Sequence, residues 1–174
     1  NDAAQKLECD LIVVGARPGG LLNRFRIGTV PSSLLYTAQT PVALAPQGYS
    51  YPGPITGISA LVGPRRGRSD VAAIGLDRAN RREIPLRIIT LKISGEDAGY
   101  GFELPLSEAI EEAVSKGQAS RITTSGSSVQ SALRNLSWEE GEVAVLGSAR
   151  IASDGRLFLG TTAHRILKHL PFPT

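Results

Sequence analysis

Short apolar runs alternate along the chain with segments whose apolar residues recur at helical spacing. The runs predict strands over residues 11–14, 41–45, 55–62, 86–93 and 143–147, with a weaker strand over 121–124. The helical spacing predicts helices over residues 29–38, 69–83, 104–116, 127–136 and 161–170. Strands that alternate with helices favour an α/β fold, in which helices cover both faces of a parallel sheet.

Small polar residues precede several of these predicted helices and serve as candidate N-caps. Thr29 is the predicted N-cap of its helix, with Pro31 in the first turn. Ser69, Ser107 and the Ser127–Ser128 pair are predicted to cap three others.

No charged residue occurs between Ile27 and Pro64, a stretch long enough to cross a bilayer. Several prolines and glycines interrupt it, and they would break a spanning helix. We therefore interpret the stretch as buried strands around an uncharged linker over residues 46–54.

The chain contains an internal repeat with an offset of 132 residues, which places residues 10–41 on residues 142–173 without a gap. Seven of these 32 positions are identical, and they fall at a strand end, a loop end, a helix start and the next strand start. In both copies a glycine ends the strand, and thirteen residues later a second glycine is followed by threonine. These residues are Gly15, Gly28 and Thr29 in the first copy and Gly147, Gly160 and Thr161 in the second.

The segment from Asp10 to Leu21 is similar to the phosphate loop of flavin- and nicotinamide-binding folds, whose fingerprint is G-x-G-x-x-G. The middle glycine of that fingerprint is Arg17 here, and no acidic residue follows before Asp70 to hold a ribose. A flavin- or nicotinamide-dependent oxidoreductase is therefore kept as an alternative to the interpretation below.

The spacing that the two copies share predicts an anion site. A glycine at a strand's carboxyl end permits a tight turn, and the free N–H groups at the start of the next helix attract negative charge. Arginines in the intervening loops would either contact a phosphate or a partner, or remain solvated; they are Arg17, Arg24 and Arg26 in the first copy and Arg150 and Arg156 in the second.

These two segments resemble the C-terminal part of universal stress protein domains, whose nucleotide motif is G-2x-G-9x-G-[ST]. The first and last elements of the motif hold in both copies, whereas the central glycine is Pro18 in one copy and Arg150 in the other. The aspartate that follows the first strand in ATP-binding members is absent here. In its place Arg65, Arg66 and Arg68 would suit a more acidic ligand or a partner's surface.

The resemblance implies a doubly wound, open, five-stranded parallel sheet, Rossmann-like and similar to the adenine nucleotide alpha hydrolase fold, in a tandem repeat. Residues 1–48 would be the C-terminal part of a first domain, and residues 49–174 a second domain without its final strand. The chain, which has no methionine, would then be part of a longer tandem protein.

The resemblance also implies ATP or a related adenine nucleotide as ligand, held by Gly15, Gly28, Thr29, Gly147, Arg150, Gly160 and Thr161. It implies a homodimer or intramolecular pairing of the tandem domains, and a non-catalytic role in the stress response. If no nucleotide binds, the same fold would act as a dimerising interaction module.

Charge, cysteine content and histidine spacing limit the ligands, partners and cellular location that the sequence predicts. The 174 residues carry a net charge of +3, too weak to indicate nucleic acid, and neither a signal peptide nor a membrane span is expected. Cys9 is the only cysteine, which excludes an internal disulfide and suggests a cytoplasmic setting, with the thiol buried or at a strand edge. His164 and His169 lie five residues apart on one predicted helix, so no metal site is predicted. The Gly63–Ser69 loop differs from a P-loop in spacing, and we interpret it as a solvated basic loop. Trp138 is expected to pack on the end of the sheet.

Overall fold

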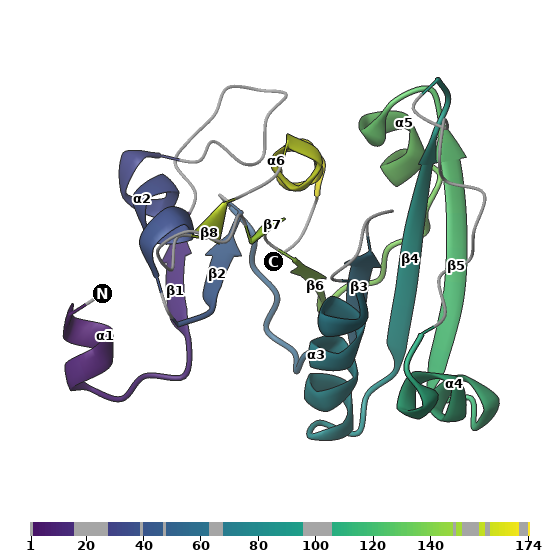
Figure 1. Ribbon diagram of the computed structural model, residues 1–174, viewed down its shortest axis with the longest axis horizontal. Coiled ribbons are helices and arrows are strands. Elements are labelled where there is room, and N and C mark those ends of the chain that lie inside the picture. The colour runs from purple at the N-terminus through teal and green to yellow at the C-terminus, as the bar shows by residue number, and fades with distance from the viewer. Residues whose placement is uncertain are drawn as a thin grey trace. The chain divides into compact units, whose positions relative to one another are not determined.

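A computed structural model (Figure 1) describes residues 2–15, 28–38, 40–46, 48–62, 68–95, 106–147, 149–150, 157–158, 161–170 and 174. Its contacts divide the chain into two compact units. One contains residues 51–147, called here the central unit, and the other contains residues 1–50 together with 148–174, called here the terminal unit. The first break lies within two residues of the predicted domain boundary at residue 48, and the predicted assignment of residues to domains stays a prediction.

The central unit is built on four parallel strands in the order β5-β4-β3-β6. They are β3 (Gly57–Val62), β4 (Leu86–Ile93), β5 (Ala119–Gly126) and β6 (Glu142–Leu146). All six residues of β3 are buried, as expected for an apolar strand between two neighbours. The parallel sheet and the alternation of strands and helices confirm the predicted α/β fold.

In the described part of the central unit, three helices cover this sheet on both faces. They are α3 (Arg68–Asn80), α4 (Glu108–Ser115) and α5 (Val129–Arg134). The helices α3 and α4 contact each other, and their residues join the cluster formed by Ile58, Ala60 and Ile88. The helix α5 lies on the opposite face, where Thr124 donates a hydrogen bond to the carbonyl of Ala132 (2.9 Å). The chain runs from β3 through β4 to β5 and then returns to β6 on the other side of β3, and this reversal of direction is typical of doubly wound sheets.

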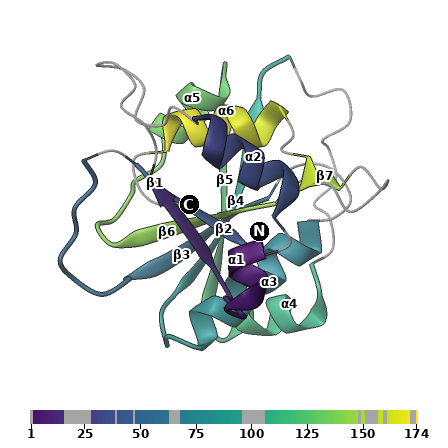
Figure 2. The same ribbon diagram turned by 90° about the vertical axis from the view of Figure 1, so that its left-hand side faces the viewer.

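The terminal unit contains a two-stranded parallel sheet of β1 (Ile12–Gly15) and β2 (Val42–Ala45). Figure 2 views this strand pair from the β1 side. Its helices are α1 (Asp2–Lys6), α2 (Thr29–Thr37) and α6 (Thr161–His169), and the short strands β7 (Ala149–Arg150) and β8 (Leu157–Phe158) pair antiparallel. Leu44 and Thr174 exchange two backbone hydrogen bonds of 2.6 and 3.1 Å.

The helix bounds support the internal repeat. The helices α2 and α6 both have nine residues, and the offset of 132 places Thr29–Thr37 on Thr161–His169 end to end. The strand β1 likewise falls within one residue of β6 at its carboxyl end. The repeat seen in the sequence is therefore also a repeat of strand and helix positions.

Some details of the prediction were wrong. The N-cap of α2 is Gly28, and Thr29 is the first helical residue. The strand predicted over 121–124 is eight residues long, because it pairs with β4 along its whole length. The short elements α1, β7 and β8 were not predicted, since they are too short to show a periodic pattern. Among the described residues no helix is long and apolar enough to cross a membrane.

Candidate functional site

In the first copy the predicted glycines and threonine lie at the edges of one loop. Gly15 ends β1, Gly28 caps α2, and Thr29 begins that helix with an exposed side chain. Gly28 is extended (φ −72°, ψ 176°), and its carbonyl accepts the N–H of Ser32 at 2.9 Å. The loop between Gly15 and Gly28 lies outside the described residues, and Arg17, Pro18, Arg24 and Arg26 lie in it.

The start of α2 is not neutralised by its own side chains. It has no side-chain cap, because the residue at that position is glycine, and no acidic residue lies in its first turn. By contrast, Glu108 and Glu111 lie in the first turn of α4, and the hydroxyl of Ser128 accepts the N–H of Ser131 at the start of α5 (3.1 Å). Among the described residues, no side chain therefore competes with an anion for the first N–H groups of α2.

In the second copy the predicted residues are divided between the two units. Gly147 follows β6 in the central unit, whereas Arg150 in β7 and Thr161 at the start of α6 belong to the terminal unit. No acidic residue lies in the first turn of α6, as in α2. Gly160 and the side chains of Arg150 and Thr161 lie outside the described residues, as do Arg65, Arg66 and Arg156 and the side chain of Arg68.

Gly147 has a packing role that the sequence did not show. A Cβ atom at this position would lie 2.5 Å from Cγ2 of Val71 on α3, so the glycine lets the helix approach the strand end. At Gly15, the equivalent position, a Cβ atom would meet no described atom within 4 Å. The same glycine thus meets different surroundings in the two copies.

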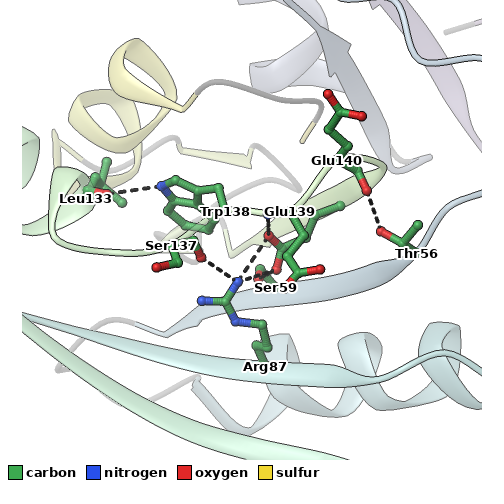
Figure 3. A network of polar contacts seen from close by, with 9 residues as sticks. Thr56, Ser59, Arg87, Leu133, Ser137, Trp138, Glu139 and Glu140 are labelled. Atoms are coloured by element: carbon green, nitrogen blue, oxygen red, sulfur yellow. Dashed lines mark hydrogen bonds and ion pairs between the residues drawn. The ribbon is translucent and has the colours of Figure 1, made fainter.

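A buried polar cluster lies at the amino ends of the strands, and sequence reasoning missed it (Figure 3). The Glu142 carboxylate accepts hydrogen bonds from the Ser59 hydroxyl and from Nη1 of Arg87, at 2.9 and 3.2 Å for the latter. Its Oε2 also accepts the N–H of Glu139 at 3.3 Å, and Ser59 and Glu142 are 0% and 2% exposed. The only signal in the sequence was an acidic residue directly before the predicted strand in both copies, Asp10 and Glu142.

Trp138 completes this cluster. Its indole N–H donates to the carbonyl of Leu133 at 3.1 Å, and the Arg87 guanidinium lies 5.5 Å from its ring centroid. The prediction that Trp138 packs at the sheet end is confirmed. Since every member of the cluster is satisfied internally, its role is to hold the segment before β6 against β3 and β4.

The remaining candidate residues that the structure describes do not assemble into a reactive site. In the part of the chain that the structure describes, no group of three or more metal-ligating side chains occurs. Burial, and secondarily the charge of Lys168, lowers the pKa of His164. Cys9 is exposed and lies before β1, outside any strand, so the prediction of a thiol buried or at a strand edge was wrong.

A parallel sheet covered by helices on both faces defines the class of doubly wound α/β proteins. The model of the universal stress protein family matches residues 1–46. Universal stress proteins of Mycobacterium bovis and of Mycobacterium tuberculosis H37Rv are each 28% identical to this chain over 191 residues, which cover 99% of it and 65% of the relative. A universal stress protein structure from Archaeoglobus fulgidus superposes with a TM-score of 0.68 at 15% identity, covering 99% of this chain and 62% of that one.

The chain is similar to universal stress proteins, and its residues 1–46 match the model of that family. It spans about two thirds of the length of the curated relatives it matches, 65% in each case.

Proposed function

We propose that the chain is a non-catalytic stress-response module, located in the cytoplasm, which binds an adenine nucleotide such as ATP through its phosphates. The observation that carries the proposal is the start of α2, where Gly28 leaves the first N–H groups without a side-chain cap and no acidic residue opposes an anion. The similarity to universal stress proteins makes an adenine nucleotide the expected ligand.

A non-catalytic role fits the polar groups that the structure describes. The cluster of Ser59, Arg87 and Glu142 combines a hydroxyl, a cation and a carboxylate, but Ser59 and Glu142 are buried and hydrogen-bonded to each other. A substrate cannot reach them, so the cluster stabilises the fold and does not react.

Calorimetry with ATP, ADP and AMP tests the nucleotide proposal on the 174-residue chain. We expect heat of binding, and we expect Gly28→Val to abolish it, because a side chain there would block the approach of the phosphates. The φ of Gly28 is −72°, which any residue adopts, so the variant should fold. Ser33→Ala, an exposed change further along α2, is the matched control.

Two outcomes of this experiment would overturn the nucleotide proposal. No heat at millimolar nucleotide would leave an interaction module of the same fold, and unchanged affinity in Gly28→Val would place the site elsewhere. An absorbance spectrum of the same sample tests the oxidoreductase alternative, which flavin bands or a thermal shift with NAD(P) would favour.

We also propose that the two copies of the repeat pair with each other, within one chain or between two. Thr174 directly follows the second copy, and its two backbone bonds to Leu44 form the closely spaced pair of an antiparallel ladder. The offset of 132 places Thr174 on Val42 of β2, so equivalent segments meet in opposite directions, as in a two-fold interface. Light scattering of the purified chain distinguishes a monomer from a dimer.

A further inference from the structure

The first residues of the central unit, 51–56, precede β3 and contact the turn before β6. We call residues 51–56 the strap and residues 137–141 the β6 turn. Two hydrogen bonds join them. The Thr56 hydroxyl donates to the carbonyl of Glu140 at 2.7 Å (Figure 3), and the Thr56 N–H donates to the carbonyl of Gly141 at 3.0 Å. Both bonds come from one residue, at the end of the strap that leads into β3.

The beginning of the strap contacts the β6 turn through the ring of Tyr51. A Cβ atom at Gly141 would lie 2.5 Å from Cε1 of Tyr51, and one at Gly53 would lie 2.6 Å from its hydroxyl oxygen. The ring therefore occupies the space that a side chain would need at either glycine. Gly141 also has a φ of +81°, a conformation that favours glycine. The strap thus closes on the turn through one aromatic ring that lies against two glycines.

The β6 turn is held more firmly than the strap. Arg87 donates to the carbonyl of Ser137 (3.0 Å) and to the carboxylate of Glu142, which directly follows the turn. The same carboxylate, 2% exposed, accepts the N–H of Glu139. In the strap, by contrast, residues 52–56 are exposed. Segments with few buried contacts and exposed hydrogen bonds are the ones that open locally, so we expect the strap to leave the turn while the turn stays folded.

The strap shortens one connection between the two units. Pro46 is a buried residue of the terminal unit, and Tyr51 is the first residue of the central unit, so residues 47–50 join them. When the strap opens, the connection grows to residues 47–56. The greatest distance that it can span then more than doubles, since an extended chain adds about 3.3 to 3.6 Å per residue. The units are also joined between residues 147 and 148, so an open strap permits them to turn about that second connection.

We propose that the strap is a conformational switch that sets how far the two units move relative to each other. In the closed state the Tyr51 ring lies on Gly141 and Thr56 bonds to the turn, and in the open state these contacts are lost together. The ring decides the balance, because water replaces the hydrogen bonds of Thr56 but does not replace an apolar contact. The switch needs no ligand, so its test is independent of nucleotide binding.

Amide hydrogen exchange of the 174-residue chain tests whether the strap opens by itself. The N–H of Thr56 reports on the strap, and the N–H of Ile58, which donates to the carbonyl of Pro85 (3.0 Å), reports on β3. We expect Thr56 to exchange at least about 100-fold faster than Ile58, because opening of the strap leaves β3 paired. Tyr51→Ala should speed exchange at Thr56 by about a further tenfold and leave Ile58 unchanged, because it removes most of the apolar contact. Tyr51→Phe is the matched control, which keeps the ring and should behave like the wild type.

Energy transfer between the units tests the effect on their movement. Trp138 is the only tryptophan and lies in the central unit, whereas Cys9 is the only cysteine, is exposed and lies in the terminal unit. A fluorophore on Cys9 therefore reports the distance to Trp138 in the otherwise unchanged chain. We expect Tyr51→Ala to broaden the distribution of this distance and Tyr51→Phe to leave it unchanged. An unlabelled sample of each variant corrects for changes in the emission of Trp138.

Two results would overturn the proposal. Equal exchange at Thr56 and Ile58 would show that the strap opens only when the central unit unfolds. An unchanged distance distribution in Tyr51→Ala, with faster exchange at Thr56, would show that the strap does not control the movement of the units. If Tyr51→Ala does not fold, Thr56→Val replaces it: this variant loses one hydrogen bond and keeps the ring, so it should speed exchange at position 56 by a smaller factor.

Discussion

The strands β1 and β6 occupy equivalent places in the two copies of the repeat, but their surroundings differ. Glu142 at the start of β6 is 2% exposed and holds Ser59 and Arg87, whereas Asp10 before β1 is exposed. Gly147 after β6 packs on Val71, whereas Gly15 at the end of β1 meets nothing described. The shared sequence pattern therefore marks strands that have the same residues at equivalent positions. Which other elements lie next to each strand determines whether those residues are buried.

The largest expected difference between the two strands concerns their acidic residues. Glu142→Ala should destabilise the central unit by about 3 to 5 kcal/mol, because it leaves Arg87 unpaired in a buried site. Urea unfolding followed by the fluorescence of Trp138, the only tryptophan, reports on this unit. Asp10→Ala is the matched control and should leave both units unchanged. Equal midpoints for Glu142→Ala and wild type would contradict the role assigned to the cluster.

The next largest expected difference in stability is between alanine variants of Gly147 and Gly15. Gly147→Ala should cost about 1 to 3 kcal/mol, because the β-branched side chain of Val71 is stiff and must move to admit the new methyl group. Gly15→Ala should have no such cost in the chain alone. Urea unfolding by circular dichroism measures both variants. If Gly15→Ala were as destabilising as Gly147→Ala, the face of β1 would already be covered and the difference between the copies would not hold.

The sequence predicted the α/β fold because its signals are local. An apolar run such as Leu86–Ile93 was predicted with its observed bounds, since buried apolar residues lie on both faces of the strand: Leu86, Ile88, Ile89 and Ile93. The strand over 121–124 was underestimated because its outer residues, Ser120 and Ser125 among them, are polar and are held by pairing with β4. Tertiary pairing, which a local pattern does not contain, decided that length.

The candidate site was predictable only in part, for the same reason. The glycine and threonine spacing located the start of α2 to within one residue, because helix starts have a local signature. The cluster of Ser59, Arg87 and Glu142 was not predictable, because its members lie up to 83 residues apart. Only the sheet order brings them together, and that order follows from the whole fold.

Changes at the helix starts of the two units should have smaller effects on stability than the changes at the glycines. Ser128→Ala should destabilise the central unit by about 1 kcal/mol, because it removes the side-chain cap of α5. Gly28→Ser should stabilise α2 slightly, since it supplies a cap that the helix lacks. The same change should weaken nucleotide binding, because the hydroxyl would compete for the N–H groups. Thermal unfolding and calorimetry measure the two effects, and a Gly28→Ser variant that binds nucleotide unchanged would argue against phosphates at this helix.

The smallest expected difference between the two equivalent helices is in how stability depends on pH. His164 of α6 takes the place of Ser32 of α2, and burial, with a smaller effect of Lys168, lowers its pKa below 6.5. A histidine with a lowered pKa binds its proton more readily in the unfolded chain, so stability is complete above pH 6.5 and falls as the pH drops through that value. Thermal unfolding at pH 7.5 and pH 5.5, compared between wild type and His164→Asn, should show a small loss of melting temperature at the lower pH that the variant reduces. Because the side chain is only partly buried, the loss should be less than that of Ser128→Ala, and an identical pH response in both proteins would assign the dependence to other groups.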